Sequence, residues 1–157
     1  MKLIINNPDR LDLDEFCEWL LPKVQEELLV RISPAKCQKR DEDIANSGVV
    51  QYVGTTRVVP TETLIKQAII SLKWDKLPNG TYELSISKRM MVYGSTTTID
   101  TIARLIEYGT EKITPMPLFR PVFKTFEEMI QEWYNLYMDE NYGGSEEWVQ
   151  HYMIMQS

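Results

Sequence analysis

The residues that most often carry out chemistry in enzymes are few in this chain and poorly placed for it. His151 is the only histidine, and Cys17 and Cys37 show neither a Cys-x-x-Cys nor a Cys/His spacing, so we expect no zinc site. The sequence has no glycine-rich phosphate loop and no Gly-x-Ser-x-Gly nucleophile motif. Cys17 lies among apolar residues and is predicted to be a core thiol. We therefore expect no catalytic residue, no metal, no cofactor and no enzyme activity.

Two pairs of adjacent carboxylates occur, Glu127 with Glu128 and Glu146 with Glu147. Neighbouring positions on a helix point in different directions, so these pairs are predicted to be solvated charges, not acid/base partners. Tyr82 is the only aromatic residue in the best strand candidate, and one aromatic does not make a platform for single-stranded nucleic acid. We predict that Tyr82 belongs to the core.

Composition places the chain among ordinary globular proteins. Its 157 residues, 43% of them hydrophobic, suffice for one domain with a buried core. The net charge of −6 disfavours nucleic acid and anionic lipid as general partners. The densest basic stretch, Lys36, Lys39 and Arg40, is followed at once by acids and is predicted to be a solvated loop.

The chain shows no targeting or membrane signal. The apolar start at residues 3–5 is much shorter than a signal-peptide core, and no stretch approaches the roughly 18 apolar residues of a membrane helix. We expect the product to stay in the cytoplasm where it is made, or to go where an assembly takes it, without contacting a membrane.

The N-terminal third contains one strong helix signal and one long segment without a period. Apolar residues at helical spacing predict a helix over residues 12–32, with Asp12 as N-cap and Glu15 reaching back to it. Pro22 predicts a kink or break near Leu21. Residues 34–60 are predicted to be a long loop, in which 48–53 could form a strand or arm.

The rest of the chain alternates between helix and strand signals. The hydrophobic pattern and the turn residues first predict a helix at 61–72 after Pro60, then a turn at Asn79-Gly80 with Trp74 in the partner strand. Two strands are predicted next, at 81–87 and 89–93. A helix at 99–106 ended by Gly109, a stiff connector at 110–121 and a long helix at 122–138 with Pro121 at its first position complete the prediction.

The sum is an α+β domain of three or four helices and a small, mainly antiparallel sheet. We assign it to residues 1–142. Residues 143–157 form a hinged C-terminal tail after Gly143-Gly144, in which Trp148, Tyr152 and Met153 are candidates for docking on the same domain or on a neighbour.

Residues 103–121 carry a motif of many fixed positions. It reads Ala-Arg, two apolar residues, Glu, an aromatic and Gly-Thr, then a short spacer and Pro-x-Pro, two bulky apolar residues and Arg-Pro. The matching residues are Ala103, Arg104, Glu107, Tyr108, Gly109, Thr110, Pro115, Pro117, Leu118, Phe119, Arg120 and Pro121. This segment resembles the signature of the tail-completion, or head–tail joining, proteins of long-tailed double-stranded DNA bacteriophages. They are similar in role to the tail-completion protein Z of phage lambda.

The resemblance extends to the order of elements along the chain, with two departures. The family usually has Thr-Gly before its second helix, whereas this chain has Thr61-Glu62, and members of the family are often more basic. The resemblance implies a virion structural protein in the phage neck, between the head connector and the tail tube. It implies a homo-oligomeric ring, for example of six or twelve copies, with other neck and tail proteins as partners and phage DNA only as passing cargo. An acidic ring would let DNA pass without binding it.

Two alternatives stay open at this point. One is a tail terminator or another connector-layer protein. The other, of a different class, is a small intracellular enzyme or regulator acting as a monomer or dimer. Within the motif, Arg120 and Glu107 either tie the connector to its own domain or lie at a subunit contact.

Overall fold

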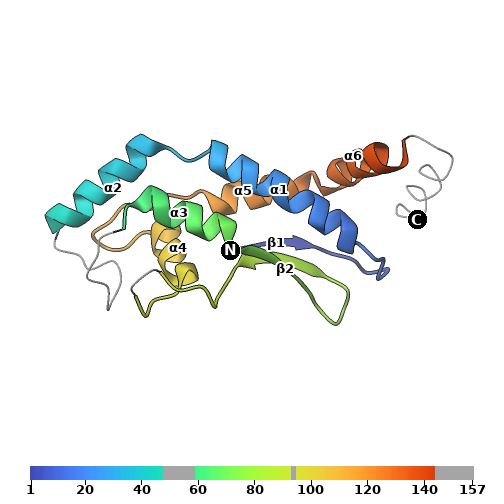
Figure 1. Ribbon diagram of the computed structural model, residues 1–157, viewed down its shortest axis with the longest axis horizontal. Helices are drawn as coiled ribbons and strands as arrows, with labels where there is room; N and C mark the ends of the chain where they lie inside the picture. The colour runs from blue at the N-terminus through green and yellow to red at the C-terminus, as the bar shows by residue number, and fades with distance from the viewer. Residues whose placement is uncertain (48–58, 93–94, 144–157) are drawn as a thin grey trace.

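The computed structural model of the chain describes residues 1–47, 59–92 and 95–143. They form an α+β fold, as predicted, with more helices than the sequence indicates (Figure 1). Part of the predicted loop is a helix, and the last predicted helix is two. The elements are β1 (Lys2–Ile5), α1 (Asp14–Val30), α2 (Pro34–Ser47), α3 (Thr61–Ile70), β2 (Leu72–Lys76), β3 (Tyr82–Ile86), α4 (Ile99–Tyr108), α5 (Phe119–Glu128) and α6 (Ile130–Tyr142).

The sheet is small and antiparallel, with strand order β1-β3-β2. The predicted hairpin is present: Trp74 pairs with Leu84, and the turn between the strands places Gly80 at φ 92°. The edge strand β1, which no pattern predicted, pairs with β3 through Leu3 opposite Leu84. With only four residues, β1 is too short for its alternation to stand out.

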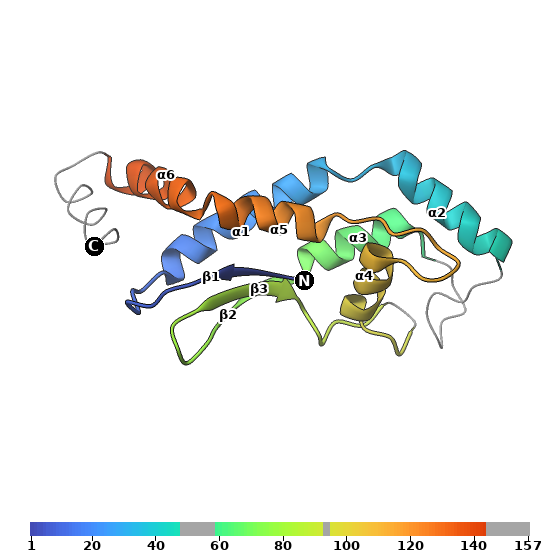
Figure 2. The ribbon, with the colours of Figure 1, turned by 180° about the vertical axis from the view of Figure 1, so that it is seen from behind.

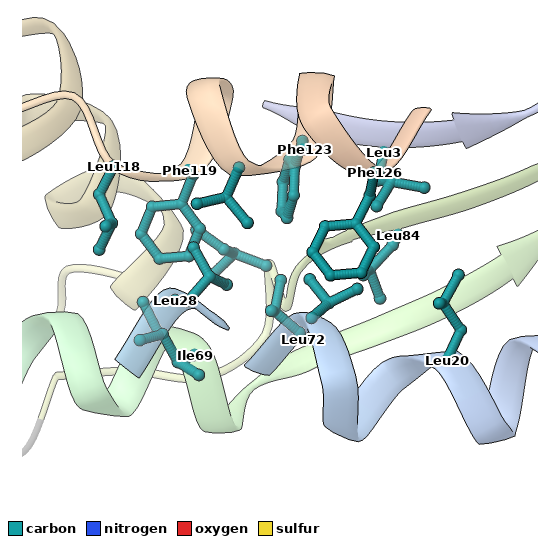
Figure 3. Close-up of a cluster of buried hydrophobic side chains, with 14 of the residues drawn as sticks. Leu3, Leu20, Leu28, Ile69, Leu72, Leu84, Leu118, Phe119, Phe123 and Phe126 are labelled. Atoms are coloured by element: carbon teal, nitrogen blue, oxygen red, sulfur yellow. The ribbon is translucent and has the colours of Figure 1, made fainter. Parts of the chain in front are cut away.

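The hydrophobic core lies between one face of the sheet and helices α1 and α5 (Figures 1 and 2). Alternation along β3 buries Tyr82, Leu84 and Ile86, which confirms the predicted inward face. Figure 3 shows Phe119, Phe123 and Phe126 of α5 facing side chains from β1, β3, α1 and α3. Cys17 is 2% exposed in this core, as predicted.

A kink or break was predicted near Leu21; helix α1 runs from Asp14 to Val30 as one element, so a break there is wrong. Pro22 removes one backbone hydrogen bond, but Leu20 and Val24 beside it are fully buried, and packing supplies most of a helix's stability in a protein. The predicted cap is also wrong. The N-cap position is Leu13, and the Asp12 carboxylate accepts a hydrogen bond from Asp14 N at 3.1 Å. Glu15 does not reach back to Asp12 but accepts a hydrogen bond from the Tyr137 hydroxyl at 3.4 Å.

The predicted loop at 34–60 is helical over its first part, as α2; residues 48–58, with the possible strand at 48–53, lie outside the described residues. Ser33 and Pro34 begin α2 instead of only ending α1. The Ser33 hydroxyl accepts from Lys36 N at 3.3 Å, and proline suits the first helical position. The basic stretch is therefore one helix with two environments, because Lys36 and Lys39 are exposed while Arg40 is only 5% exposed.

Where a strand was predicted at 89–93, the described residues form only one isolated β-bridge, between Met91 and Thr98. Tyr93 lies outside the described residues. The backbone of this segment forms a hydrogen bond with the start of α4. Ile99 N donates to the Met90 carbonyl at 2.8 Å, and the Thr98 hydroxyl caps α4 by accepting from Thr101 N.

The single helix predicted at 122–138 is two helices, broken at Met129, whose ψ of 18° is not helical. Both halves contact α1, and α5 also packs on β1. Phe126 of α5 faces the sheet core, whereas Tyr134 and Tyr137 of α6 contact Phe16 of α1 with ring centroids 5.2 and 5.5 Å apart. The break lets each apolar stripe follow its own surface.

The molecule is elongated, with α2 at one end and α6 at the other (Figures 1 and 2). Between them, α1 contacts both α5 and α6, and α3 contacts both α2 and α4. Within the described ranges, no helix has the length and apolar character needed to cross a membrane.

Phe123 offers a test of the core. It is 2% exposed, so Phe123→Ala is expected to lower the free energy of unfolding by about 3–5 kcal/mol. Val30→Ala is the control, because Val30 is 73% exposed and its truncation should change stability by about 0.5 kcal/mol or less. Urea denaturation followed by circular dichroism measures both, and equal effects would contradict this packing.

Candidate functional site

The motif segment is organised around one buried carboxylate, Glu107 at the end of α4. Its side chain is 1% exposed. Oε1 accepts from Leu118 N at 2.8 Å and Phe119 N at 2.9 Å, and Oε2 accepts from Arg120 N at 3.1 Å. These are the free amide groups at the start of α5, which has no side-chain cap of its own. Glu107 therefore caps the following helix across the connector, where a negative charge also suits the helix dipole.

Pro121 fits this arrangement at the third position of α5, not the predicted first one. After the amides of Leu118, Phe119 and Arg120, a fourth amide at this position would need a partner, but proline has no N–H to donate. The next amide, on Val122, already donates to the Leu118 carbonyl at 3.4 Å. The amides of this helix start are thus accounted for.

Arg120 lies between Glu107 and Tyr108. Its Nε donates to Glu107 Oε2 at 3.2 Å, and its guanidinium carbon is 4.2 Å from the centre of the Tyr108 ring. The Arg120 side chain is 47% exposed and Tyr108 is 50% exposed. The pair thus ties the connector to its own domain, while Arg120 and Tyr108 still present an aromatic and a cationic surface to a partner.

The turn after α4 depends on Gly109. Its φ of 71° and ψ of −174° lie in a region that only glycine visits readily. A Cβ there would be 2.7 Å from both the Ile113 carbonyl oxygen and Pro115 N. Thr110 N donates to that same carbonyl at 2.9 Å, and Met116 N donates to the Ile106 carbonyl at 2.9 Å. The connector therefore closes a tight turn directly after α4 and is tied back to α4 through Met116.

The structure sorts the motif residues by exposure. The buried ones set the conformation; besides Glu107, they are Ala103, Leu118 and Phe119. The exposed ones are available to a partner, and besides Tyr108 and Arg120 they are Arg104, Thr110, Pro115, Pro117 and Pro121. Arg104 pairs with Asp100 one turn earlier at 3.1 Å. The motif thus places exposed residues of α4, the connector and α5 on a backbone fixed by its buried members.

A groove of about 370 Å³ runs beside the connector, within the range of roughly 300–1,000 Å³ usual for ligand sites. One wall is the turn between α1 and α2 together with one face of α2, and the other is connector residues 113–118. Ile65, Met116 and Leu118 contribute apolar surface, and Lys36 and Lys39 contribute positive charge. No sequence pattern indicated this groove, because its walls are far apart in the chain.

A second capping arrangement fixes the α2 wall. The Asp41 carboxylate of α2 accepts from Thr61 N at 3.0 Å and from the Thr61 hydroxyl at 2.6 Å, at the start of α3. Arg40 Nη1 donates to the same hydroxyl at 3.0 Å. The charged run at 39–43 was a possible signal, but the partner at Thr61 could not be identified from spacing.

The structure shows the environments of the two cysteine thiols and of the Glu127–Glu128 pair, for which no catalytic role was predicted. Burial raises the pKa of the Cys17 thiol to about 12, with Asp14 adding to the shift, so the thiol is neutral at physiological pH. Burial also raises the pKa of the Cys37 thiol. Glu127 accepts from Ile4 N at 2.7 Å while Glu128 lies 3.9 Å from Lys124, so these carboxylates diverge as predicted.

Metal ligands do not gather in the described part of the chain: no group of three or more His, Cys, Asp and Glu side chains there could hold an ion. The remaining sequence candidates lie outside the described residues, and these are His151, Glu146, Glu147, Trp148, Tyr152 and Met153.

Glu107→Gln tests the buried cap. An amide can accept through only one of its two terminal atoms, so at least one amide of the α5 start loses its partner. We expect a loss of about 2–4 kcal/mol in the free energy of unfolding. Glu128→Gln is the matched control, because its pair with Lys124 is exposed and should contribute about 0.5 kcal/mol or less. Thermal and urea unfolding measure both variants, and a Glu107→Gln protein as stable as the control would refute the capping role.

Gly109→Ala tests the turn. We expect it to destabilise the fold by about 3 kcal/mol or more, because backbone strain adds to the clash with the Ile113 carbonyl. Gly143→Ala is the control. It also has positive φ, 61°, but has nothing within 4 Å of the added Cβ, so it should lose only about 1 kcal/mol. Equal losses in urea denaturation would show that the connector yields to the new methyl group.

Similarity to known proteins adds no further constraint. The chain has no match among protein-family models, curated proteins or solved structures.

Proposed function

We propose that the chain is a virion structural protein of a tailed bacteriophage. It is a tail-completion or head–tail joining protein, made in the host cytoplasm, that forms a ring in the neck between the head connector and the tail tube. The observation that carries the proposal is the motif at residues 103–121, whose residue types and order resemble the signature of that protein family.

The geometry of the motif supports a role in assembly. Glu107 and Gly109 hold the connector in one conformation, so Tyr108 and Arg120 are presented without further ordering when a partner binds. Surfaces ordered in advance lose less conformational entropy on association. Tyrosine and arginine are also the residue types that most often dominate binding at protein interfaces.

The elongated shape also supports a ring. A closed ring repeats one heterologous contact, in which one end of a subunit meets a different surface of the next. Here α2 and α6 lie at opposite ends of the molecule (Figure 1). Each end could contact a different neighbour.

The net charge of −6 supports the idea that DNA is passing cargo. Attraction between cationic side chains and phosphates supplies most non-specific DNA affinity, and an acidic ring provides little of it. A ring whose channel proved to be basic would contradict this part of the proposal.

Assembly is tested by light scattering over a concentration series, with negative-stain microscopy of any large species. We expect a closed ring of six or twelve copies, alone or on purified tails of long-tailed phages. Tyr108→Ser should weaken ring formation at least about tenfold, the usual effect of truncating a central interface aromatic. Ile70→Ser, at an exposed residue outside the motif, is the control.

A chain that remains monomeric up to its solubility limit, and that also fails to bind such tails, would contradict the proposed function. An assembly that Tyr108→Ser and Ile70→Ser affect equally would show that the motif surface is not its interface.

A further inference from the structure

The groove beside the connector differs in charge from the rest of the protein. Arg31, Lys36 and Lys39 line it, and among the described residues of its lining Asp43 is the one acid. Asp43 lies 3.6 Å from Lys39 Nζ, and Arg31 Nε lies 2.6 Å from Glu27. Side-chain exposure is 49% for Arg31 and 75% for Lys39, so these cations are accessible from solvent. An acidic protein thus carries a local basic rim over an apolar floor.

The floor and rim together specify the chemistry of an occupant. Ile65 is 2% exposed and Leu118 9% exposed, and with the half-buried Met116 they form an apolar base. A suitable ligand has large apolar side chains next to negative charge. The volume of about 370 Å³ admits one or two such side chains, not a folded domain.

The chain contains one segment of this chemistry beyond α6. Residues 143–157 include no lysine or arginine, and Glu146 and Glu147 directly precede Trp148. Tyr152 and Met153 follow Trp148 closely in the sequence. The pairing of acids with an aromatic residue matches the basic rim and the apolar floor.

We propose that this groove binds the C-terminal segment of a neighbouring copy of the chain, with Trp148 on the apolar floor and Glu146 and Glu147 against Lys36 and Lys39. The inference rests on the proposed function, because it supplies the contact that would join subunits in the ring.

The position of the two partners indicates a contact between copies. Helix α6 ends at Tyr142, at the end of the molecule opposite α2, which forms one wall of the groove (Figures 1 and 2). A segment leaving one end and a receptor near the other end make a head-to-tail contact, which closes into a ring when the rotation allows. Fully extended, the residues after Tyr142 span at most about 50 Å, so the segment can bridge adjacent subunits.

A labelled peptide tests the docking chemistry. The probe is a fluorescein-labelled peptide of residues 143–157. The receptor is the full chain carrying Trp148→Ala and Tyr152→Ala, the tail variant, so that its own C-terminus does not compete. We expect saturable binding by fluorescence anisotropy. Adding Lys36→Glu and Lys39→Glu to the receptor should weaken it about tenfold or more, since two charge pairs are reversed.

Reversing the charges of the peptide tests directly whether its glutamates pair with the groove lysines. A peptide with Glu146→Lys and Glu147→Lys should bind the Lys36→Glu, Lys39→Glu receptor better than the unaltered peptide does. Lys73→Glu with Lys88→Glu, on the open face of the sheet, is the matched control and should leave binding unchanged. The docking site is refuted if the peptide does not bind, if both lysine pairs matter equally, or if the reversed peptide restores nothing.

Mixing tests whether the contact joins two copies. The full chain with only Lys36→Glu and Lys39→Glu keeps its C-terminal segment but loses its groove, whereas the tail variant keeps its groove. Neither should assemble alone, and an equimolar mixture should give a complex of one copy of each by light scattering. A mixture that stays monomeric overturns docking between copies, even where the peptide binds.

The failure of this inference is distinguishable from failure of the proposed function. Rings that persist in the tail variant would overturn the docking site and leave the neck protein proposal in place. Another phage protein or a small anionic molecule as the true occupant would appear as a peptide that fails to bind.

Discussion

The start of α5 is buried, and the way its amides are satisfied determines much of the molecule. Leu118 precedes the helix and offers no side-chain cap, so a partner must come from elsewhere in the chain. Glu107 provides it from the end of α4, eleven residues earlier. Satisfying three amides with one carboxylate requires α4 and α5 to keep a fixed separation, and the connector between them must turn sharply enough to permit it. Gly109 and the proline at the third position of α5 follow from that requirement.

The same solution occurs once more on the other side of the groove. Asp41 of α2 caps the start of α3, which also lacks a side-chain cap of its own. One carboxylate therefore fixes the α2 wall and another fixes the connector wall. Each cap joins helices across an irregular segment, so a few charged hydrogen bonds fix the position of each wall together with the apolar packing of Cys37 and Leu118. This arrangement accounts for a rigid groove near one end of an elongated molecule.

Hydrophobic pattern predicted the parts of the fold that apolar packing determines. The buried face of β3, the stripe of α1 and the start of α4 at Ile99 all follow from residue spacing. Helix α2 was missed because its buried face is Cys37 and Arg40, which give no apolar period. The break at Met129 was missed because both helices are amphipathic, and the sequence does not show that α5 packs on β1 as well as on α1 while α6 packs on α1. An Arg120–Glu107 pair that ties the connector to its own domain was one of two alternatives from sequence, but the Glu107 cap on the start of α5 was not predicted, since a pairing across eleven residues has no local signature.

Charge gives a further reason for linking the groove to assembly. Copies of an acidic protein repel one another at long range, which opposes random association. A contact that sets two glutamates against exposed lysines reverses that repulsion at one place only, and an aromatic side chain on an apolar floor gives it affinity. Under the proposed function, such a contact favours the one head-to-tail arrangement over side-by-side aggregation. The contact would also be sensitive to salt, because Lys39 is largely exposed to solvent. At 0.1 M ionic strength the Debye length is about 10 Å, and it becomes shorter as salt is added, which weakens the attraction between exposed charges. Ring assembly that weakens as salt rises, while the fold remains stable, is therefore the behaviour that this surface should produce.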